Sequence, residues 1–292
     1  MDRTASEVFC GGSRVKQYAA TDYDSRAVEA ARRVLLELTR VLGEYDEEIA
    51  VVGGWVPPLL MPGAGHIGST DVDLALDHEA LQEPRYATLR ALLERSDYYA
   101  DPEQNYVFYR DVALGDGGEP DPIVVEVDLV AAEYGLAGKK RQSQQVQDIR
   151  ARKARGADLL FDRGLAEEVS IEGPLPSGAT LRTRVRVAGP VPFLVMKANA
   201  IARRDKPKDA YDVWFMLSNH QVGLDGLAAA VAEHAGHGLV QEALDHLANA
   251  FASVDHVGPR AVADFLELDP GTEEYDRVRQ DAYQRVQYIL QQ

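Results

Sequence analysis

Two aspartates separated by one residue, Asp71 and Asp73, are the side chains best suited to chemistry in this sequence. They open an apolar run that ends at Leu76 and reads as a β-strand, and side chains two apart on a strand point to the same face. Val72 and Leu74 then point the other way, into a core. Adjacent carboxylates repel each other, so the pattern predicts a divalent cation, Mg²⁺ or Mn²⁺, which also keeps contact with phosphate oxygens.

A pair of glycines, Gly53 and Gly54, follows another short apolar run, residues 49–52. A glycine pair between a strand and a helix places bare backbone N–H groups where phosphate can bind. A phosphate site beside metal-binding carboxylates predicts chemistry on a nucleoside triphosphate (NTP). The alternative is an ordinary strand end with two solvated aspartates.

The order Gly-Gly, a gap, then Asp-hydrophobic-Asp-hydrophobic resembles the signature of the polymerase-β-like nucleotidyltransferase superfamily. The gap from Gly54 to Asp71 holds 16 residues, which is longer than usual for that superfamily. Trp55 stands where many members carry Ser or Thr. The resemblance therefore leaves a phosphate-contacting hydroxyl to Ser69 or Thr70.

A third carboxylate is expected on a later strand. Residues 105–113 and 123–131 are strand candidates separated by turn-forming residues. In the second, Glu126 and Asp128 share one face of an otherwise apolar strand, where acidic groups are costly unless they are partnered. The superfamily resemblance implies that a third carboxylate completes the metal site and accepts the proton of the attacking hydroxyl. We choose Asp128, with Glu126 as its rival; an acid in a salt bridge on an edge strand is the alternative.

A second charged cluster consists of Lys197, Lys208, Asp209 and Asp212. Lys197 falls within the apolar stripe of a predicted helix, where its ammonium needs triphosphate oxygens or a carboxylate as partner, unless it snorkels at the edge of the stripe. The next helix starts at Pro207, which puts Asp209 in the first turn, where a carboxylate suits the helix dipole. Asp212 shares a face with Asp209.

The order Lys-x-x-Ala, Arg, then Lys-Pro-Lys-Asp-x-x-Asp is similar to the C-terminal motifs of AbiEii-type nucleotidyltransferases, the toxin halves of type IV toxin–antitoxin and abortive-infection systems. The resemblance implies that Lys197 contacts the triphosphate and that Lys208, Asp209 and Asp212 close the site from the helical side. It also implies Mg²⁺-dependent transfer of a nucleoside monophosphate to a hydroxyl of tRNA or another cellular acceptor, with a cognate antitoxin as the partner to look for.

Composition limits the class of protein. The chain has 292 residues, 46% of them hydrophobic and 27% charged, which fits a soluble globular protein. No apolar run is long enough to cross a membrane, and the N-terminus lacks the features of a signal peptide. The single cysteine, Cys10, cannot form an internal disulfide, which fits the cytoplasm. We therefore expect a cytoplasmic protein without a membrane partner.

The net charge of −16 argues against a protein that grips long nucleic acids over its whole surface. Residues 139–208 reverse the balance, with 16 Lys and Arg against 7 Asp and Glu. This basic segment suits a triphosphate or one arm of an RNA in a local groove. The alternative is that these charges lie on solvated faces, including the row Arg182, Arg184 and Arg186.

The expected fold is α/β (α+β): a polymerase-β-like mixed sheet with helices, followed by a C-terminal helical domain. We divide the chain into a poorly ordered arm (1–24), a nucleotidyltransferase domain (25–189) and a helical domain (190–292) that completes the active site. Helices are predicted over residues 25–45, 84–95, 150–163, 227–235, 239–253, 259–267 and 273–290. The last four carry no readable chemistry, and the histidines among them (His234, His237 and His246) lack a metal-ligand spacing.

Three other functions stay open. A transferase that modifies a cationic small molecule such as an aminoglycoside suits the acidic surface, because electrostatic steering favours a positive substrate. A transferase that modifies proteins tolerates the same charge. A degenerate transferase that binds nucleotide or a partner without catalysis is the third, and Trp55 is the feature that favours it. The acceptor and the preferred NTP do not follow from the sequence.

Overall fold

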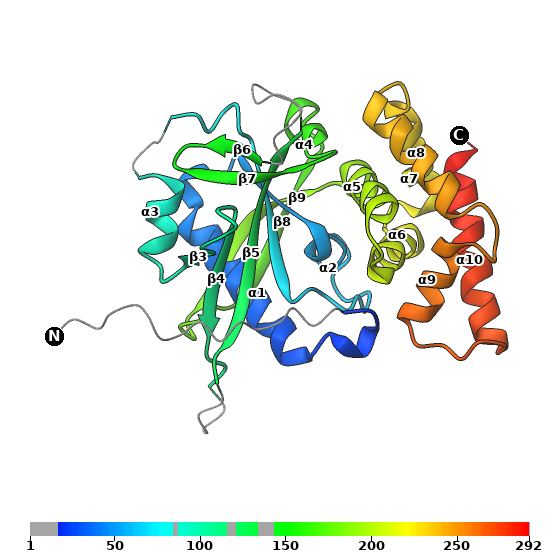
Figure 1. Ribbon diagram of the computed structural model, residues 1–292, viewed down its shortest axis with the longest axis horizontal. Coiled ribbons are helices and arrows are strands. Elements are labelled where there is room, and N and C mark those ends of the chain that lie inside the picture. Colours follow the sequence, from blue (N-terminus) through cyan, green and yellow to red (C-terminus); the bar gives the residue numbers. More distant parts are fainter. Residues whose placement is uncertain (1–16, 84–86, 116–120, 134–142, 292) are drawn as a thin grey trace.

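One mixed sheet and a set of C-terminal helices make up the computed structural model (Figure 1), which describes residues 17–83, 87–115, 121–133 and 143–291. The strand order is β3-β4-β5-β2-β1-β9-β8, and β7 pairs with both β5 and β6. The strands are β1 Ile49–Val52, β2 Asp71–Leu76, β3 Tyr99–Ala100, β4 Val107–Val112, β5 Ile123–Ala132, β6 Ser143–Val146, β7 Ile149–Ala154, β8 Ala166–Pro174 and β9 Thr180–Ala188. The predicted mixed α/β fold is confirmed.

The centre of the sheet is β2, which lies between β1 and β5. It pairs antiparallel with β1 and parallel with β5. Every residue of β1 is buried, and on β2 the alternation is as predicted, since Val72 and Leu74 are buried while Asp71 and Asp73 are partly exposed. The apolar side of β2 therefore faces the core, and its aspartates face a cleft.

The helices fall into two groups. Those within the sheet-containing part are α1 Ser25–Val41, α2 Val56–Leu60, α3 Leu89–Glu94 and α4 Asp158–Asp162. Those after the sheet are α5 Pro190–Arg203, α6 Pro207–Asn219, α7 Gly223–His234, α8 Gly238–Ala250, α9 Val257–Phe265 and α10 Glu273–Leu290. None of the helices among the described residues is long and apolar enough to span a membrane.

In Figure 1 the second group lies to one side of the sheet, with α5 and α6 nearest to it. Helix α5 packs against α6, α8 and β9, and α6 packs against α9. The strands end at Ala188 and the helices begin at Pro190, which is where we placed the domain boundary. The domain division itself stays a prediction.

The predicted N-terminal arm falls mostly on residues 1–16, which lie outside the described residues. Its last part joins the two halves of the molecule. The side-chain amide of Gln17 donates to Thr70 Oγ1 at 3.0 Å, just before β2. Thr21 N–H donates to Glu267 at 3.1 Å, and buried Tyr23 packs edge-to-face on Phe265 with ring centroids 5.8 Å apart.

The helix predicted over residues 150–163 is wrong for its first half. Residues 149–154 form β7, which extends the sheet beside β5, and the helix that follows, α4, is short. The alternation of buried Ile149 and Ala151 with exposed Arg150 is a strand pattern. Pairing with β5 and β6 outweighs the helical propensity of this basic segment.

Other elements differ mainly at their ends. The helix predicted over residues 84–95 begins at Leu89, where Thr88 accepts a capping hydrogen bond from Ala91 N–H, and residues 84–86 lie outside the described part. The short strands β3 and β6 were not predicted. The four C-terminal helices are confirmed to within a few residues at each end.

Candidate active site

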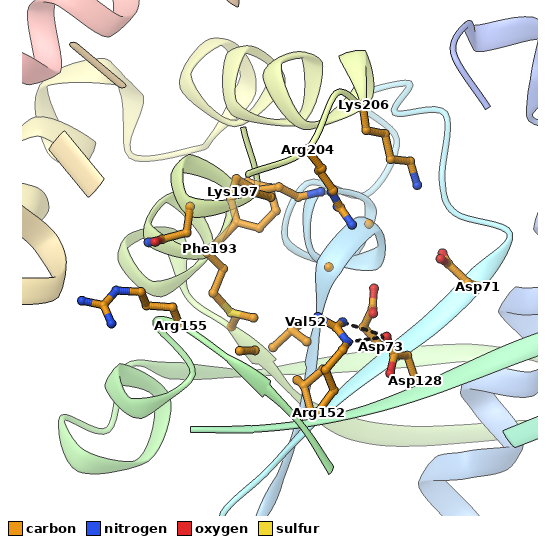
Figure 2. A pocket seen from close by; sticks show the side chains of 18 of the residues that line it. Val52, Asp71, Asp73, Asp128, Arg152, Arg155, Phe193, Lys197, Arg204 and Lys206 are labelled. Atoms are coloured by element: carbon orange, nitrogen blue, oxygen red, sulfur yellow. Dashed lines mark hydrogen bonds and ion pairs between the residues drawn. The ribbon is translucent and has the colours of Figure 1, made fainter. Parts of the chain in front are cut away.

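A pocket of about 320 Å³ lies between the sheet and the first two helices of the C-terminal group. One wall carries carboxylates from β2 and β5, and the other carries lysine and arginine side chains from α5, α6 and the segment between them (Figure 2). The glycine pair and Ser69 also line it. The pocket therefore joins the two predicted charged clusters, since Asp71 and Asp73 lie more than 100 residues before Lys197 and Lys208 in the sequence.

The carboxylates come together because β2 and β5 are parallel neighbours. In their register Asp71 is opposite Glu126, and Asp73 is opposite Asp128. Opposite residues on adjacent strands share a face, so all four acids face the pocket. The structure thus brings both candidates for the third carboxylate to the site, with Asp128 beside Asp73.

The glycine pair allows a close approach that other residues would block. Gly53 has φ +70°, and a Cβ atom built on it would lie 2.0 Å from Asp73 Oδ2. A Cβ atom on Gly54 would lie 2.5 Å from Ser69 Oγ and 3.1 Å from Lys208 Nζ. Glycine is therefore required at both positions so that Asp73, Ser69 and Lys208 can pack on this backbone.

Ser69 and Thr70, the two candidates for the phosphate-contacting hydroxyl, have different surroundings. Ser69 is buried, lines the pocket and donates to Asp71 Oδ1 at 2.5 Å. Thr70 bonds Gln17 instead and does not line the pocket. Of the two, only Ser69 is placed to meet a ligand.

Trp55 has a structural place beside the site. Its side chain is buried, and the indole N–H donates to the main-chain carbonyl of Asp71 at 2.8 Å. The indole therefore fixes the start of β2, where the aspartates emerge. This contact gives Trp55 a structural role at the start of β2.

The two neighbouring aspartates have opposite electrostatic settings. Burial, together with the charges of Asp71 and Asp128, raises the pKa of Asp73 to about 7. Burial would also raise the pKa of Asp71, but the Lys206 charge and the Ser69 hydrogen bond outweigh it, and the pKa of Asp71 is lowered. Of these two aspartates, Asp71 is ionised, whereas Asp73 is costly to ionise while no divalent cation is near.

The opposite wall is built on two buried aspartates of α6. Lys197 Nζ lies 2.9 Å from Asp209 Oδ1 and 2.6 Å from Asp212 Oδ2. Arg204 binds Asp209 through two nitrogens, at 2.7 and 2.9 Å, and Lys208 lies 2.9 Å from Asp212 Oδ1. The cations line the pocket, whereas Asp209 and Asp212 lie behind them, 1% and 0% exposed.

These contacts determine which groups are charged. Burial would raise the pKa of Asp209, but the Lys197 charge and the Arg204 hydrogen bonds lower it to about 2. Asp212 is shifted well below its usual pKa by Lys197 and Lys208, again against the effect of burial. Burial lowers the pKa of Lys208, and Asp212 offsets this only in part. Asp209 and Asp212 therefore stay ionised and hold the lysines, rather than facing the pocket themselves.

His66 belongs to the same network and was missed by the sequence reasoning. Its side chain is 1% exposed, with Nε2 2.9 Å from Asp212 Oδ1. Its Nδ1 accepts the Gly68 N–H at 3.0 Å, so the ring proton is on Nε2 and points at Asp212. Burial lowers the pKa of His66 to about 4. The ring lies in a connection without periodicity, so no sequence pattern marks it.

Arg152 is the other functional residue that was missed. Its Nη2 and Nε lie 2.7 and 3.1 Å from Asp128 Oδ2, as the dashed lines in Figure 2 show. The sequence analysis predicts a helix over residues 150–163, where the structure has β7. A helix at this place does not bring Arg152 next to β5. An alternating reading of residues 149–154 would have placed it on a strand.

The acids fit a divalent metal ion in type and register, because hard cations prefer carboxylate oxygens. The acidic side chains do not lie close enough together for this, however. Within the described ranges no group of three or more His, Cys, Asp or Glu is arranged to hold a metal ion. Asp71 is bonded to Ser69 and Asp128 to Arg152. In Figure 2 the carboxylate of Asp71 also lies apart from those of Asp73 and Asp128.

Comparison with protein families gives one match. The model described as "Nucleotidyl transferase AbiEii toxin, Type IV TA system" matches residues 68–285, about three quarters of the chain. The matched region contains the aspartates of β2 and the charged cluster of α5 and α6, and it starts after the glycine pair. No curated protein matches the chain.

Proposed function

The chain belongs to the AbiEii family of nucleotidyltransferase toxins, and from that membership we propose that it transfers a nucleoside monophosphate from an NTP to a hydroxyl of tRNA. The family implies nucleotidyltransferase activity, a nucleotide substrate and an antitoxin partner. The acceptor, the metal and the residue roles below are our proposals, and we place the reaction in the cytoplasm, where NTP and tRNA occur together.

The observation that carries the proposal is the division of the pocket into an acidic and a basic wall. Asp71, Asp73 and Asp128 line one side, and Lys197 and Lys208 line the other. A triphosphate bound with a divalent cation needs both kinds of group, one for the metal and one for the phosphate oxygens. Phosphoryl transfer gains most from positioning and charge neutralisation, which such a pocket supplies.

We assign the phosphate oxygens to Lys197, Lys208, Arg204 and Lys206, which line the pocket on its helical side. Asp209 and Asp212 position these cations from behind and do not touch the nucleotide. Ser69 and the bare backbone of the glycine pair approach the phosphates from the sheet side. In this arrangement Asp209 and Asp212 remain essential to the site, although they do not contact the nucleotide.

Asp71, Asp73 and Asp128 would hold Mg²⁺ or Mn²⁺, which supplies neutralisation of the developing phosphate charge. The acceptor oxygen forms a bond to the α-phosphorus, and its proton passes to the carboxylate of Asp128. The bond from the α-phosphorus to the bridging oxygen breaks, and pyrophosphate leaves toward the lysines. No protein nucleophile is needed, in agreement with a pocket of acids and cations.

The tRNA acceptor is supported by further cations at the same pocket. Lys153 and Arg203 line it in addition to the groups above, whereas Arg155, which also lines it, pairs with Glu133 and Glu242. Together they give a local positive surface for a phosphate backbone on a chain whose net charge is −16. Arg182 and Arg184 of the arginine row do not line this pocket and pair with Glu172 and Glu168 on β8.

The test is incubation with each labelled NTP and Mg²⁺ in the presence of tRNA, lysate protein or an aminoglycoside. Label in tRNA alone is expected. Label in protein or in the antibiotic would keep the transferase and replace the acceptor. Label in no pool, with wild type and under all four nucleotides, would support the degenerate reading and overturn the proposal.

A further inference from the structure

Arg152 and Asp128 form an ion pair inside the pocket that transfer chemistry does not require. Two nitrogens of Arg152, Nη2 and Nε, donate to the same oxygen, Asp128 Oδ2, at 2.7 and 3.1 Å. The pairing of β5 with β7 puts Arg152 opposite Val130, two residues beyond Asp128 on the same face. Two paired strands therefore fix this contact, and it does not depend on a loop.

The guanidinium stands where the acidic wall most needs positive charge. Asp128 lies opposite Asp73 in the sheet, and its side chain is 15% exposed. Two facing carboxylates in a partly buried site repel each other unless a cation lies between or beside them. Arg152 provides that cation from the protein itself.

The Arg152 guanidinium repels a divalent cation that approaches Asp128 Oδ2, because both carry positive charge. The Arg152 side chain is 40% exposed, so it can leave Asp128 without disturbing the core. Once Arg152 has left, the Asp128 carboxylate can turn toward Asp73 and the incoming ion.

We propose that Arg152 is a positioning residue that occupies Asp128 until a divalent cation arrives, and that the cation displaces it. The inference rests on the proposed function, because it takes Asp128 as a metal ligand. It adds that metal binding includes the breaking of an ion pair, which lowers the metal affinity of the site. It also accounts for the position of the Asp128 carboxylate, whose Oδ2 faces Arg152.

The test measures Mn²⁺ binding directly, through loss of the electron paramagnetic resonance signal of the free ion, without nucleotide. Arg152→Gln should bind Mn²⁺ roughly three- to tenfold more tightly than wild type, because no ion pair has to be broken. Arg152→Lys, which keeps the charge but loses the planar fork, should fall between the two. Arg150→Gln, on the same face of β7 but exposed and outside the pocket, should bind like wild type.

A double-mutant cycle links the effect to Asp128. In an Asp128→Asn background, Arg152→Gln should no longer change Mn²⁺ affinity. Without metal, Arg152→Gln should melt below wild type, and saturating Mn²⁺ should remove most of the difference. If the Gln variant does not fold, the Lys variant carries the test with an expected gain of about twofold.

Failure of this inference and failure of the proposed function give different experimental results. Wild type that takes up Mn²⁺ while Arg152→Gln binds it equally or more weakly would overturn the inference and leave the proposed function standing. Wild type that takes up no Mn²⁺ and transfers no label would overturn the metal-dependent function, whatever the variants do.

Discussion

Asp73 and Asp128 lie opposite each other on the parallel strands β2 and β5, with both side chains facing the pocket. This pairing gathers negative charge in a largely buried place, and burial with the charges of Asp71 and Asp128 raises the pKa of Asp73 to about 7. An ionised Asp73 is therefore unfavourable for the folded protein while no divalent cation is bound. Such a cost is typical of residues retained for function rather than stability.

Asp73→Asn should abolish transfer and, without metal at pH 8, raise the free energy of unfolding by about 1–4 kcal/mol. The folded carboxyl keeps its proton until about pH 7, whereas the unfolded one loses it near 3.8. Between these values the folded state binds more protons, so stability falls as pH rises. Denaturation with urea at pH 4 and pH 8 checks this: the gain should appear at pH 8 and shrink at pH 4.

Asp71→Asn is the matched comparison. Its carboxylate has a lowered pKa, with Lys206 and Ser69 favouring the charged form against burial. The Asn variant should also lose transfer but should be destabilised by about 1–2 kcal/mol at pH 8, because a charge-assisted hydrogen bond is lost. Either variant with more than about a tenth of wild-type rate, a loss below ~1.4 kcal/mol, would contradict the metal-site assignment.

Asp128 and Glu126 can be separated by their own variants. Asp128→Asn should lower the transfer rate by orders of magnitude with a smaller change in nucleotide affinity, because it faces Asp73 across the strand pair. Glu126→Gln, which faces Asp71 one pleat away, should have a milder effect. Single-turnover rates and nucleotide binding measured on both variants decide the matter, and the reverse order would make Glu126 the third carboxylate.

Local patterns in the sequence were enough to place the acidic wall. The alternation of polar and apolar residues along β2 and β5 shows which side chains share a face, because side chains two residues apart point the same way in every β-strand. The glycine pair marked a tight backbone, and Gly53 indeed has a positive φ against Asp73. What these patterns could not supply was the register of β2 and β5, which decides that Asp73, and not Asp71, meets Asp128.

The basic wall shows where sequence reasoning fails. A lysine on an apolar stripe needs a partner, but the stripe does not say whether that partner is a ligand or a buried carboxylate. The structure gives Lys197 two carboxylates, Asp209 and Asp212, on a different helix. His66 and Arg152 were missed because their roles arise from tertiary contacts with Asp212 and Asp128.

His66 should make stability depend on pH in the acid range. Its folded pKa is about 4 and its ordinary value 6.5, so between them the unfolded state binds more protons and stability falls as pH is lowered. The full effect is about 3 kcal/mol, and it is complete only near pH 4. Asp73 contributes a slope of opposite sign over the same pH range, so the His66 effect is measured as a difference between variants. In denaturation between pH 7 and pH 4, His66→Gln should become more stable relative to wild type as the pH is lowered.

His246→Gln is the control for that slope. His246 lies on α8, partly exposed, and contacts only Glu242 at 3.5 Å among its ion pairs in the described part of the chain. Its variant should keep the wild-type dependence on pH. A His66→Gln variant with the same dependence on pH as wild type would show that the imidazole does not stay neutral in the fold.

Lys197→Met should destabilise the protein by about 3–5 kcal/mol, because it leaves two buried carboxylates without their shared cation. The lysine is 7% exposed, and both partners are buried. A lysine held only for the triphosphate would have predicted no loss, since methionine suits an apolar stripe. Thermal melts with and without Mg²⁺–NTP measure both properties, and the variant should also lose most of the shift that nucleotide gives wild type.

Lys206→Met separates phosphate binding from stability. Lys206 lines the pocket at the start of α6 and extends into it in Figure 2. Its loss should weaken nucleotide binding by roughly tenfold through one charge-assisted contact. The melting temperature without ligand should fall less than in Lys197→Met, because Lys206 offsets the burial of Asp71 only, together with Ser69. If Lys197→Met melts lower yet keeps the full nucleotide shift, and Lys206→Met keeps it as well, the helical wall does not bind the triphosphate and Lys197 serves the fold alone.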